Sequence, residues 1–314
     1  MQGFHGRRPR KGLPATLHCP APFLVPTQET ARHIMTVGIG VACHGGSCVV
    51  LAADGKGSFK GEPSLSHERL GKQHALPLGL YSNLAGTVKI CNSFVNRLAS
   101  ALEGHPQNDP IRLDELLEIV ESARYAELKA RLNIEMKKHL QMTIKQWQDL
   151  PSASPRYRRG RRLNSRYWLP VEFLIGGIIR GSGCLVYFTP DEDAANEESL
   201  VCIGTGGNAA YRWLMKRNQE VHMSLPRTLL HVAEAMREAR LKNRKTVGEP
   251  ADYVVITATQ TRRMPAKDPT LQQMLASYAG RDTKEIDSSD ELHRAVQSAM
   301  YLPKAAAFKT KKER

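Results

Sequence analysis

The stretch TVGIGVACHGGSCVVLAAD, residues 36–54, decides the fold that the sequence predicts. Both of its flanks are rich in valine, isoleucine and small apolar residues, which is the composition of buried β-strands. Between the flanks stands CHGGS, residues 43–47, whose two glycines suit the tight turn of a β-hairpin. The stretch therefore predicts a strand, a turn and a second strand, with Asp54 closing the second strand.

The residues after the hairpin predict another strand and then two helices. LGLYSNLAG, residues 78–86, is a short apolar run that ends at a small-residue turn. Apolar residues then recur at helical spacing, so a helix should begin just past Gly86. A longer helical stretch is expected over residues 113–147, whereas residues 150–166 have the proline, serine and arginine content of a mobile loop.

The second half of the chain returns to strands. VEFLIGGIIRGSGCLVYFTP, residues 171–190, predicts a strand pair joined through RGSG. ESLVCIGTGG, residues 198–207, predicts a strand that ends in a glycine turn, and ADYVVITAT, residues 251–259, predicts a final buried strand. Helical spacing between these strands predicts helices at residues 208–217 and 229–241. This order is typical of a layered α+β protein with helices packed on two sheets.

The positive charge is concentrated in three segments. Residues 1–35 and 304–314 each carry a net charge of +4, and residues 155–166 carry six arginines, which together account for the whole net charge of +14. The remaining body is neutral, so the basic character belongs to the ends of the chain and to one internal segment. Few aromatic residues accompany the arginines, so specific nucleic-acid binding is not expected. Solvated charge, or a face toward nucleic acid or an acidic protein, remains open for the arginine segment.

The cysteines and the hydropathy exclude several classes of protein. The six cysteines form no Cys-x-x-Cys pair and have no metal-type spacing with histidine, so buried free thiols are expected. No window approaches 18 consecutive apolar residues, and the first residues lack a clean apolar segment before a cleavage site. We therefore expect a cytoplasmic protein without a membrane span or a metal.

Three residues at the ends of predicted elements are candidates for chemistry. Asp54 could reach a site built on a sheet edge, or it could simply form a turn before Gly55. Lys72 enters an apolar strand, where a lysine is usually just solvated. The amide of Gly86 could point into a cleft and meet a developing negative charge, although a plain strand-to-helix turn explains the residue equally well.

The order of these features along the chain resembles the proteasome subunit family. A small hydroxyl residue, Thr36, starts a strand, VVLAAD ends the hairpin, and Lys72 stands fourteen residues before an Ala-Gly turn, with LIGG, IGTGG and DYVVIT further on. The resemblance spans roughly residues 35–259 and extends to the related HslV-type bacterial peptidases. It implies an N-terminal nucleophile hydrolase. The fold of that family is an α+β fold, a four-layered αββα sandwich.

The resemblance also implies roles for individual residues. Thr36 matches the nucleophile, which in this family is the first residue of the mature chain. Lys72 would lie beside it, Asp54 would orient the lysine, and Gly86 would supply the oxyanion-hole amide. A free α-amine titrating near ~8 can take the proton of the hydroxyl, whereas an amide nitrogen cannot.

Later residues match the family's supporting positions less directly. Thr205 or Gly206 occupies the region of one supporting serine, and Asn243 and Thr246 are the nearest matches to a later aspartate and serine. The resemblance implies hydrolysis of peptide or unfolded-protein substrates in a homo-oligomeric ring, with no metal and no cofactor. An unfolding ATPase partner is left open.

The activity depends on where the mature chain begins. Translation from Met35, followed by removal of that methionine, would expose Thr36, and residues 1–34 would then be a disordered or mis-assigned extension. The expected organisation is a domain over residues 35–260, with a helical and arginine-rich insertion at about 125–168. A polar, partly helical basic tail over 261–314 follows, with a short helix expected at 288–302. If Met35 occupies the place of the nucleophile instead, the chain is an inactive structural subunit.

Overall fold

The computed structural model describes residues 36–55, 72–106, 109–166, 169–190, 192–244, 246–248, 251–265 and 267–278. The chain divides into two units, Met1–Arg32 and His33–Arg314, and every described residue belongs to the second. The expectations for residues 1–34, for Met35 and for a short helix at 288–302 lie outside the described residues.

The fold is α+β with two five-stranded sheets whose strand pairs are all antiparallel within the described ranges. The first sheet has the order β10-β9-β2-β1-β8, with the bounds Thr261–Met264, Ala251–Thr257, Cys48–Asp54, Gly38–Cys43 and Leu200–Ile203. The second has the order β3-β4-β5-β6-β7, with the bounds Gln73–Ala75, Tyr81–Gly86, Val171–Ile179, Ser182–Phe188 and Ala195–Glu197. The predicted hairpin forms as β1 and β2, joined by the short 3-10 helix η1, His44–Gly46.

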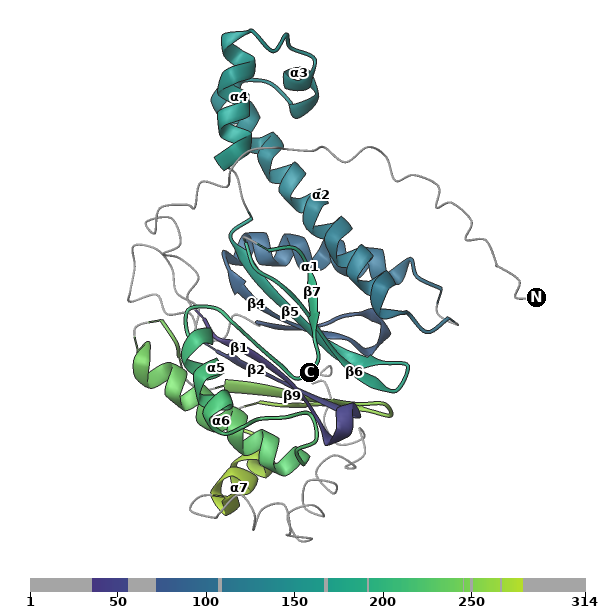
Figure 1. Ribbon diagram of the computed structural model, residues 1–314, viewed down its shortest axis with the longest axis vertical. Coiled ribbons are helices and arrows are strands. Elements are labelled where there is room, and N and C mark those ends of the chain that lie inside the picture. Colours follow the sequence, from purple (N-terminus) through teal and green to yellow (C-terminus); the bar gives the residue numbers. More distant parts are fainter. Residues whose placement is uncertain are drawn as a thin grey trace, which may run out of the picture. The chain divides into compact units, whose positions relative to one another are not determined.

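The side chains of β2 alternate between two cores, which explains why the strand reads as a continuous apolar run. Val49 and Leu51 join a cluster formed by residues of both sheets, so the sheets pack face to face. Val50 and Ala52 point the other way, into a cluster shared with α5, Gly207–Lys216, and α6, Leu225–Lys242. Figure 1 shows these two helices alongside the sheet that contains β1, β2 and β9.

The second sheet is covered by α1, Val88–Glu103, and α2, Leu113–Leu140. Three phenylalanines lie at the centre of this contact: the ring of Phe94 on α1 meets Phe173 and Phe188 edge-on, at centroid distances of 4.7 and 5.3 Å. Full burial of such a side chain stabilises the fold by roughly 1.5–3 kcal/mol. The helix expected just past Gly86 is confirmed as α1.

Two predictions for the region after α2 are wrong. The expected helix over residues 113–147 is interrupted, because α2 ends at Leu140, Gln141 takes a left-handed conformation with φ 55°, and α3, Ile144–Gln148, begins anew. The expected mobile loop at 150–166 contains α4, Pro155–Arg166. Its proline and serine mark a helix start instead: Pro155 is the first helical residue, and the hydroxyl of Ser154 accepts a hydrogen bond of 3.0 Å from the amide of Tyr157.

The region after residue 260 is also more regular than the sequence indicates. β9 is not the final strand, because β10 pairs with it after a tight turn, and α7, Pro269–Tyr278, follows. A four-residue strand is too short to show a period, which is why pattern reading misses it. The described helices include none with both the length and the apolar composition that a membrane crossing requires.

Candidate active site

The start of β1 holds Thr36 in a buried position. The residue is 2% exposed, and its carbonyl accepts a hydrogen bond of 3.1 Å from the amide of Gly206, which follows β8. β1 lies between β2 and β8, with Gly38 opposite Ala53 on one side and Ile203 on the other. This register brings the end of β2 next to Thr36.

Asp54 ends β2 and is 1% exposed, so its carboxylate needs partners. One oxygen, Oδ1, accepts hydrogen bonds from the hydroxyl of Thr36 and, at 3.0 Å, from the amide of Val37. The other, Oδ2, accepts a hydrogen bond of 3.0 Å from the amide of Gly248. Gly248 was not predicted, and the contact joins residues 194 positions apart, which no local pattern reveals.

Lys72 reaches the same point from the second sheet. It immediately precedes β3, and its carbonyl accepts a hydrogen bond of 3.2 Å from the amide of Leu84 on β4. Its ammonium donates to Asp54 Oδ1 at 2.7 Å and also to the hydroxyl oxygen of Thr36. The lysine and aspartate side chains are 12% and 0% exposed, so this ion pair is largely shielded from water.

The three side chains together polarise one hydroxyl. The Thr36 oxygen accepts from the Lys72 ammonium while its proton is donated to the Asp54 carboxylate. A positive charge within hydrogen-bonding distance of a hydroxyl oxygen stabilises a developing alkoxide, and the Asp54 carboxylate orients the lysine. The arrangement can therefore raise the nucleophilicity of the threonine. We call Thr36, Asp54 and Lys72 the threonine cluster.

A thiol near this cluster is not a competing nucleophile. Burial raises the pKa of Cys91, on α1, to about 12, although the positive charge of Lys72 acts in the opposite direction. The thiol is therefore neutral at pH 7, and a neutral thiol is a poor nucleophile.

Two glycines shape the surroundings of the threonine cluster. Gly86 ends β4 with φ +144°, and a Cβ there would lie 2.4 Å from the carbonyl oxygen of Pro170. Gly204 has φ +83°, and a Cβ there would lie 2.4 Å from the carbonyl oxygen of Thr36. Both positions therefore require glycine.

A carboxylate that the sequence did not reveal holds Gly204 in place. Glu172 lies opposite Ala85 in the β4–β5 register, and it accepts a hydrogen bond of 2.6 Å from the amide of Gly204. The side chain of Glu172 therefore ties β5 to Gly204, whose backbone packs against Thr36. Gly86 lies two residues beyond Leu84, whose amide donates to the carbonyl of Lys72, so it belongs to the same end of the sheets as the threonine cluster.

The remaining predicted residues lie on the segments that carry these backbone contacts. Thr205 is exposed, and its neighbours Gly204 and Gly206 make the contacts with the backbone of Thr36. Asn243 and Thr246 form a turn of their own after α6, in which both the amide and the hydroxyl of Thr246 donate to the carbonyl of Asn243. This turn leads to Gly248, and that residue reaches Asp54 through its backbone.

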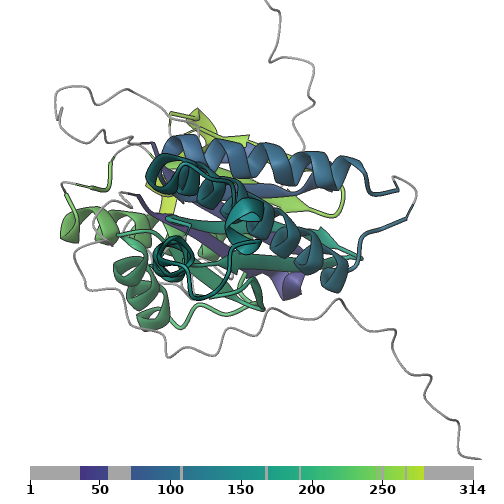
Figure 2. The ribbon, with the colours of Figure 1, turned by 90° about the horizontal axis from the view of Figure 1, so that it is seen from above.

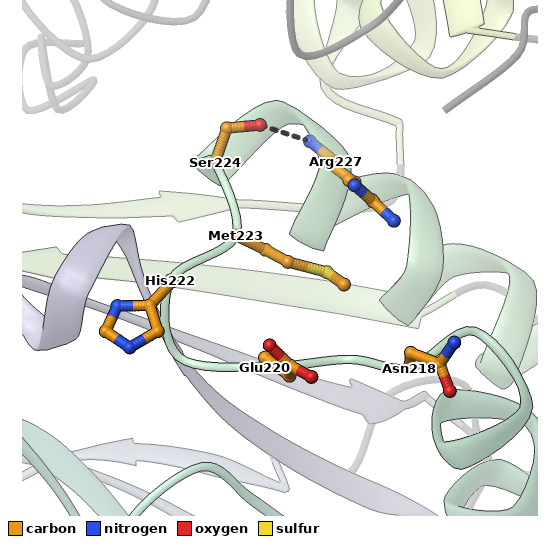
Figure 3. Close-up of a pocket in the computed structure, with 6 residues that line it drawn as sticks. All are labelled: Asn218, Glu220, His222, Met223, Ser224 and Arg227. Atoms are coloured by element: carbon orange, nitrogen blue, oxygen red, sulfur yellow. Dashed lines mark hydrogen bonds between the residues drawn. The ribbon is translucent and has the colours of Figure 1, made fainter. Parts of the chain in front are cut away.

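A separate pocket of about 530 Å³ lies on the connection between α5 and α6. Figure 3 shows its residues on that connection and on the first turn of α6: Asn218, Glu220, His222, Met223, Ser224 and Arg227. The connection is anchored to the β1–β2 turn, since the amides of His44 and Gly45 donate to the carbonyls of Met223 and Val221. None of the threonine cluster lines this pocket. We assign the candidate active site to the threonine cluster because its three side chains contact one another and polarise a hydroxyl.

Neither a metal-binding group in the described region nor a similar known protein gives further evidence on the function of this site. Within the described ranges, no group of three or more histidine, cysteine, aspartate or glutamate side chains is arranged to hold a metal ion. No family model and no curated protein matched the sequence.

Proposed function

We propose that this chain is a proteasome-like N-terminal nucleophile hydrolase with the four-layered αββα sandwich of that family. It would hydrolyse peptide bonds through Thr36. The observation that carries the proposal is the contact of the Thr36 hydroxyl with both Asp54 and Lys72, buried where the two sheets meet. The face-to-face sheets with helices on their outer faces are compatible with that architecture.

The reaction follows from the chemistry of the cluster. The Thr36 oxygen attacks the carbonyl carbon of a peptide bond, and its proton passes to a base. The oxyanion of the tetrahedral intermediate is stabilised by a backbone amide, for which Gly86 is our candidate. Collapse of the intermediate breaks the C–N bond, and the leaving amine takes the proton. Water then attacks the resulting ester, which releases the acid and restores the hydroxyl.

The base in this proposal is the α-amine of Thr36, which exists only in a chain that begins at this residue. A free α-amine titrates near ~8, close enough to neutral pH to accept a proton. The neighbouring Lys72 ammonium disfavours protonation of that amine, because like charges repel. Peptide or unfolded-protein substrates, a homo-oligomeric ring and an ATPase partner belong to the proposal as implications of the same resemblance.

The first test asks which residue begins the mature chain and whether Thr36 then reacts. The protein is purified from its native host with its natural upstream region, and its intact mass and N-terminal sequence are measured. It is then incubated with a peptide β-lactone, which acylates nucleophilic hydroxyls. We expect a chain that begins at Thr36 and one covalent adduct, which peptide mapping assigns to Thr36. Reaction with a lactone does not depend on knowing the natural substrate.

Matched variants separate nucleophilicity from folding. Thr36→Val removes the hydroxyl with little change in shape, and Thr36→Ser keeps a hydroxyl. We expect the adduct to disappear in the first and to persist in the second. Lys72→Met should slow acylation by about 10²- to 10³-fold, the usual effect of removing one charge-stabilising group. A mature chain that retains Met35 and forms no adduct would overturn the proposal and favour the inactive structural subunit.

A further inference from the structure

Helix α4 presents an arginine surface that the threonine cluster does not involve. Five of its arginines are exposed, and no lysine occurs in the helix. Figure 1 shows α3 and α4 at the C-terminal end of α2, beyond the strands, and in the view from above they lie nearest to the viewer (Figure 2). We call the five side chains the arginine face; they are Arg156, Arg158, Arg159, Arg161 and Arg162.

The helix that bears the arginine face is held by a small core of its own. The rings of Trp147 on α3 and Tyr157 on α4 stack with centroids 5.4 Å apart, and the indole N–H of Trp147 donates to the Tyr157 carbonyl at 3.0 Å. Gly160 packs so closely on Trp147 that a Cβ would lie 2.3 Å from the indole nitrogen. The arginines therefore project from a rigid support, which lowers the conformational entropy lost on binding.

No carboxylate in the described part of the chain forms an ion pair with any of these five arginines. The guanidinium of Arg158 donates to the carbonyl of Ala153 at 2.8 Å, which leaves its charge uncompensated. Like charges on neighbouring turns of a helix destabilise it. The exposed lysines Lys137, Lys138 and Lys145, on α2 and α3, add to the same positive field.

The chemistry of this surface selects phosphate. Guanidinium presents a planar fork of N–H donors that matches a phosphate group bidentately, and this residue type is preferred over lysine in nucleic-acid contacts. Single-strand binding would use exposed aromatic rings for base stacking, but the two aromatic rings that the structure describes on α3 and α4, Trp147 and Tyr157, stack on each other, and Trp147 is 8% exposed. A duplex, whose bases are already stacked, needs only contacts to its backbone.

We propose that the arginine face of α4 binds the phosphate backbone of double-stranded nucleic acid without reading its sequence. Arginine can itself pair with guanine, but the exposed residues that the structure describes in α4 include no asparagine, glutamine or aromatic side chain that would read other bases. This function is independent of hydrolysis at Thr36.

The test measures binding of the full chain to two unrelated 25-base-pair DNA duplexes by fluorescence anisotropy, over a series of KCl concentrations. We expect equal affinities for the two duplexes. If all five arginines contact phosphates, log Kobs should fall with log [KCl] with a slope near −4.5, at about −0.9 per neutralised phosphate. The fourfold variant R158Q/R159Q/R161Q/R162Q should make that slope shallower by about 3.6 and weaken binding at least about tenfold at low salt.

The control variant removes four exposed positive charges from another surface, on and after α5 and α6: R212Q/R237Q/K242Q/R244Q. It has the same net charge as the α4 variant, so we expect it to bind nearly as the unaltered chain does. Circular dichroism and the thermal midpoint check that both variants fold.

Four results would overturn the proposal. The first is an unchanged affinity in the α4 variant, and the second is an equal loss in both variants, which would make binding a matter of net charge. The third is competition by polyglutamate at the same charge concentration as effective as competition by duplex, which would indicate an acidic protein partner. The fourth is a clear preference for one of the two duplex sequences, which would indicate base readout.

Discussion

Gly204 shows how closely the chain is packed around Thr36 at the scale of single residues. Its φ of +83° is left-handed, and the Thr36 carbonyl occupies the space that a Cβ would need, at 2.4 Å. Gly181, in the turn between β5 and β6, has almost the same φ of +82° but no atom within 4 Å of a Cβ position. Both glycines therefore adopt a left-handed conformation, but only Gly204 also packs against Thr36.

We predict that Gly204→Ala destabilises the fold more than Gly181→Ala. Both substitutions place alanine in the left-handed region, at a cost of roughly 1–2 kcal/mol. Only Gly204→Ala also forces a clash with backbone, which adds about 1–3 kcal/mol. Urea unfolding of both variants gives the comparison. Equal losses would mean that Gly204 does not pack against Thr36.

At the scale of secondary-structure elements, the side chain of Glu127 on α2 connects that helix to α1. Its side chain is 1% exposed and accepts hydrogen bonds from Ser93 at 2.8 Å, Arg97 at 3.3 Å and Arg131 at 2.7 Å. Burial by itself would raise the pKa of this carboxyl, but the hydrogen bonds and the charge of Arg131 hold its pKa below the ordinary value. The charged form is therefore the one that the folded protein stabilises.

We predict that Glu127→Gln lowers the free energy of unfolding at pH 7 by about 2–3 kcal/mol, the usual contribution of hydrogen bonds to a charged group. Because the folded-state pKa is lower than the unfolded value near ~4.3, the contribution of Glu127 is present above that pH. It is lost as the pH falls through the folded-state pKa, so the difference between the variant and the unaltered chain should shrink in acid.

Urea unfolding between pH 7 and pH 3 measures this pH dependence. The exposed Glu118, on the same helix, is the control, and Glu118→Gln should change stability by less than about 0.5 kcal/mol. A constant difference between Glu127→Gln and the unaltered chain at every pH would contradict the prediction.

At the scale of the whole molecule, buried cysteines in different cores can show whether those cores unfold together. Cys48 belongs to the core between the first sheet and its helices, whereas Cys91 and Cys184 belong to the core of the second sheet. A hydrogen bond with Cys43 and burial raise the pKa of Cys48 well above its ordinary value, and burial raises the pKa of both Cys91 and Cys184 to about 12. All three thiols are therefore protonated in the folded state.

We predict that these three cysteines react with iodoacetamide at pH 8 at least roughly 10³-fold more slowly in the folded protein than in 6 M urea, because thiolate is the reactive form. Mass spectrometry of each cysteine peptide across a urea series should give one midpoint for both cores, as expected if the unit His33–Arg314 unfolds cooperatively. A lower midpoint for Cys91 and Cys184 than for Cys48 would show that the two cores unfold separately.

Local patterns predicted much of the fold. The hairpin at residues 36–54, the helix past Gly86, the β5–β6 pair and the strand that precedes α5 all agree with the structure, because apolar period and glycine turns act over a few residues. The same local reasoning mistook α4 for a loop, since a proline and a serine that start a helix have the composition of a turn. It also missed β10 and α7, whose apolar residues are too few to show a period.

The sequence by itself determined most strands and helices, through apolar pattern, and the candidate residues Thr36, Asp54 and Lys72, through resemblance to a family. The tertiary structure decided that these three side chains meet, because they stand at the ends of different strands and their contact depends on the register of β1 on β2 and on the packing of the two sheets. It also decided that Gly248 and Glu172 support them. Contacts between residues far apart in the chain follow from packing, which no local pattern encodes.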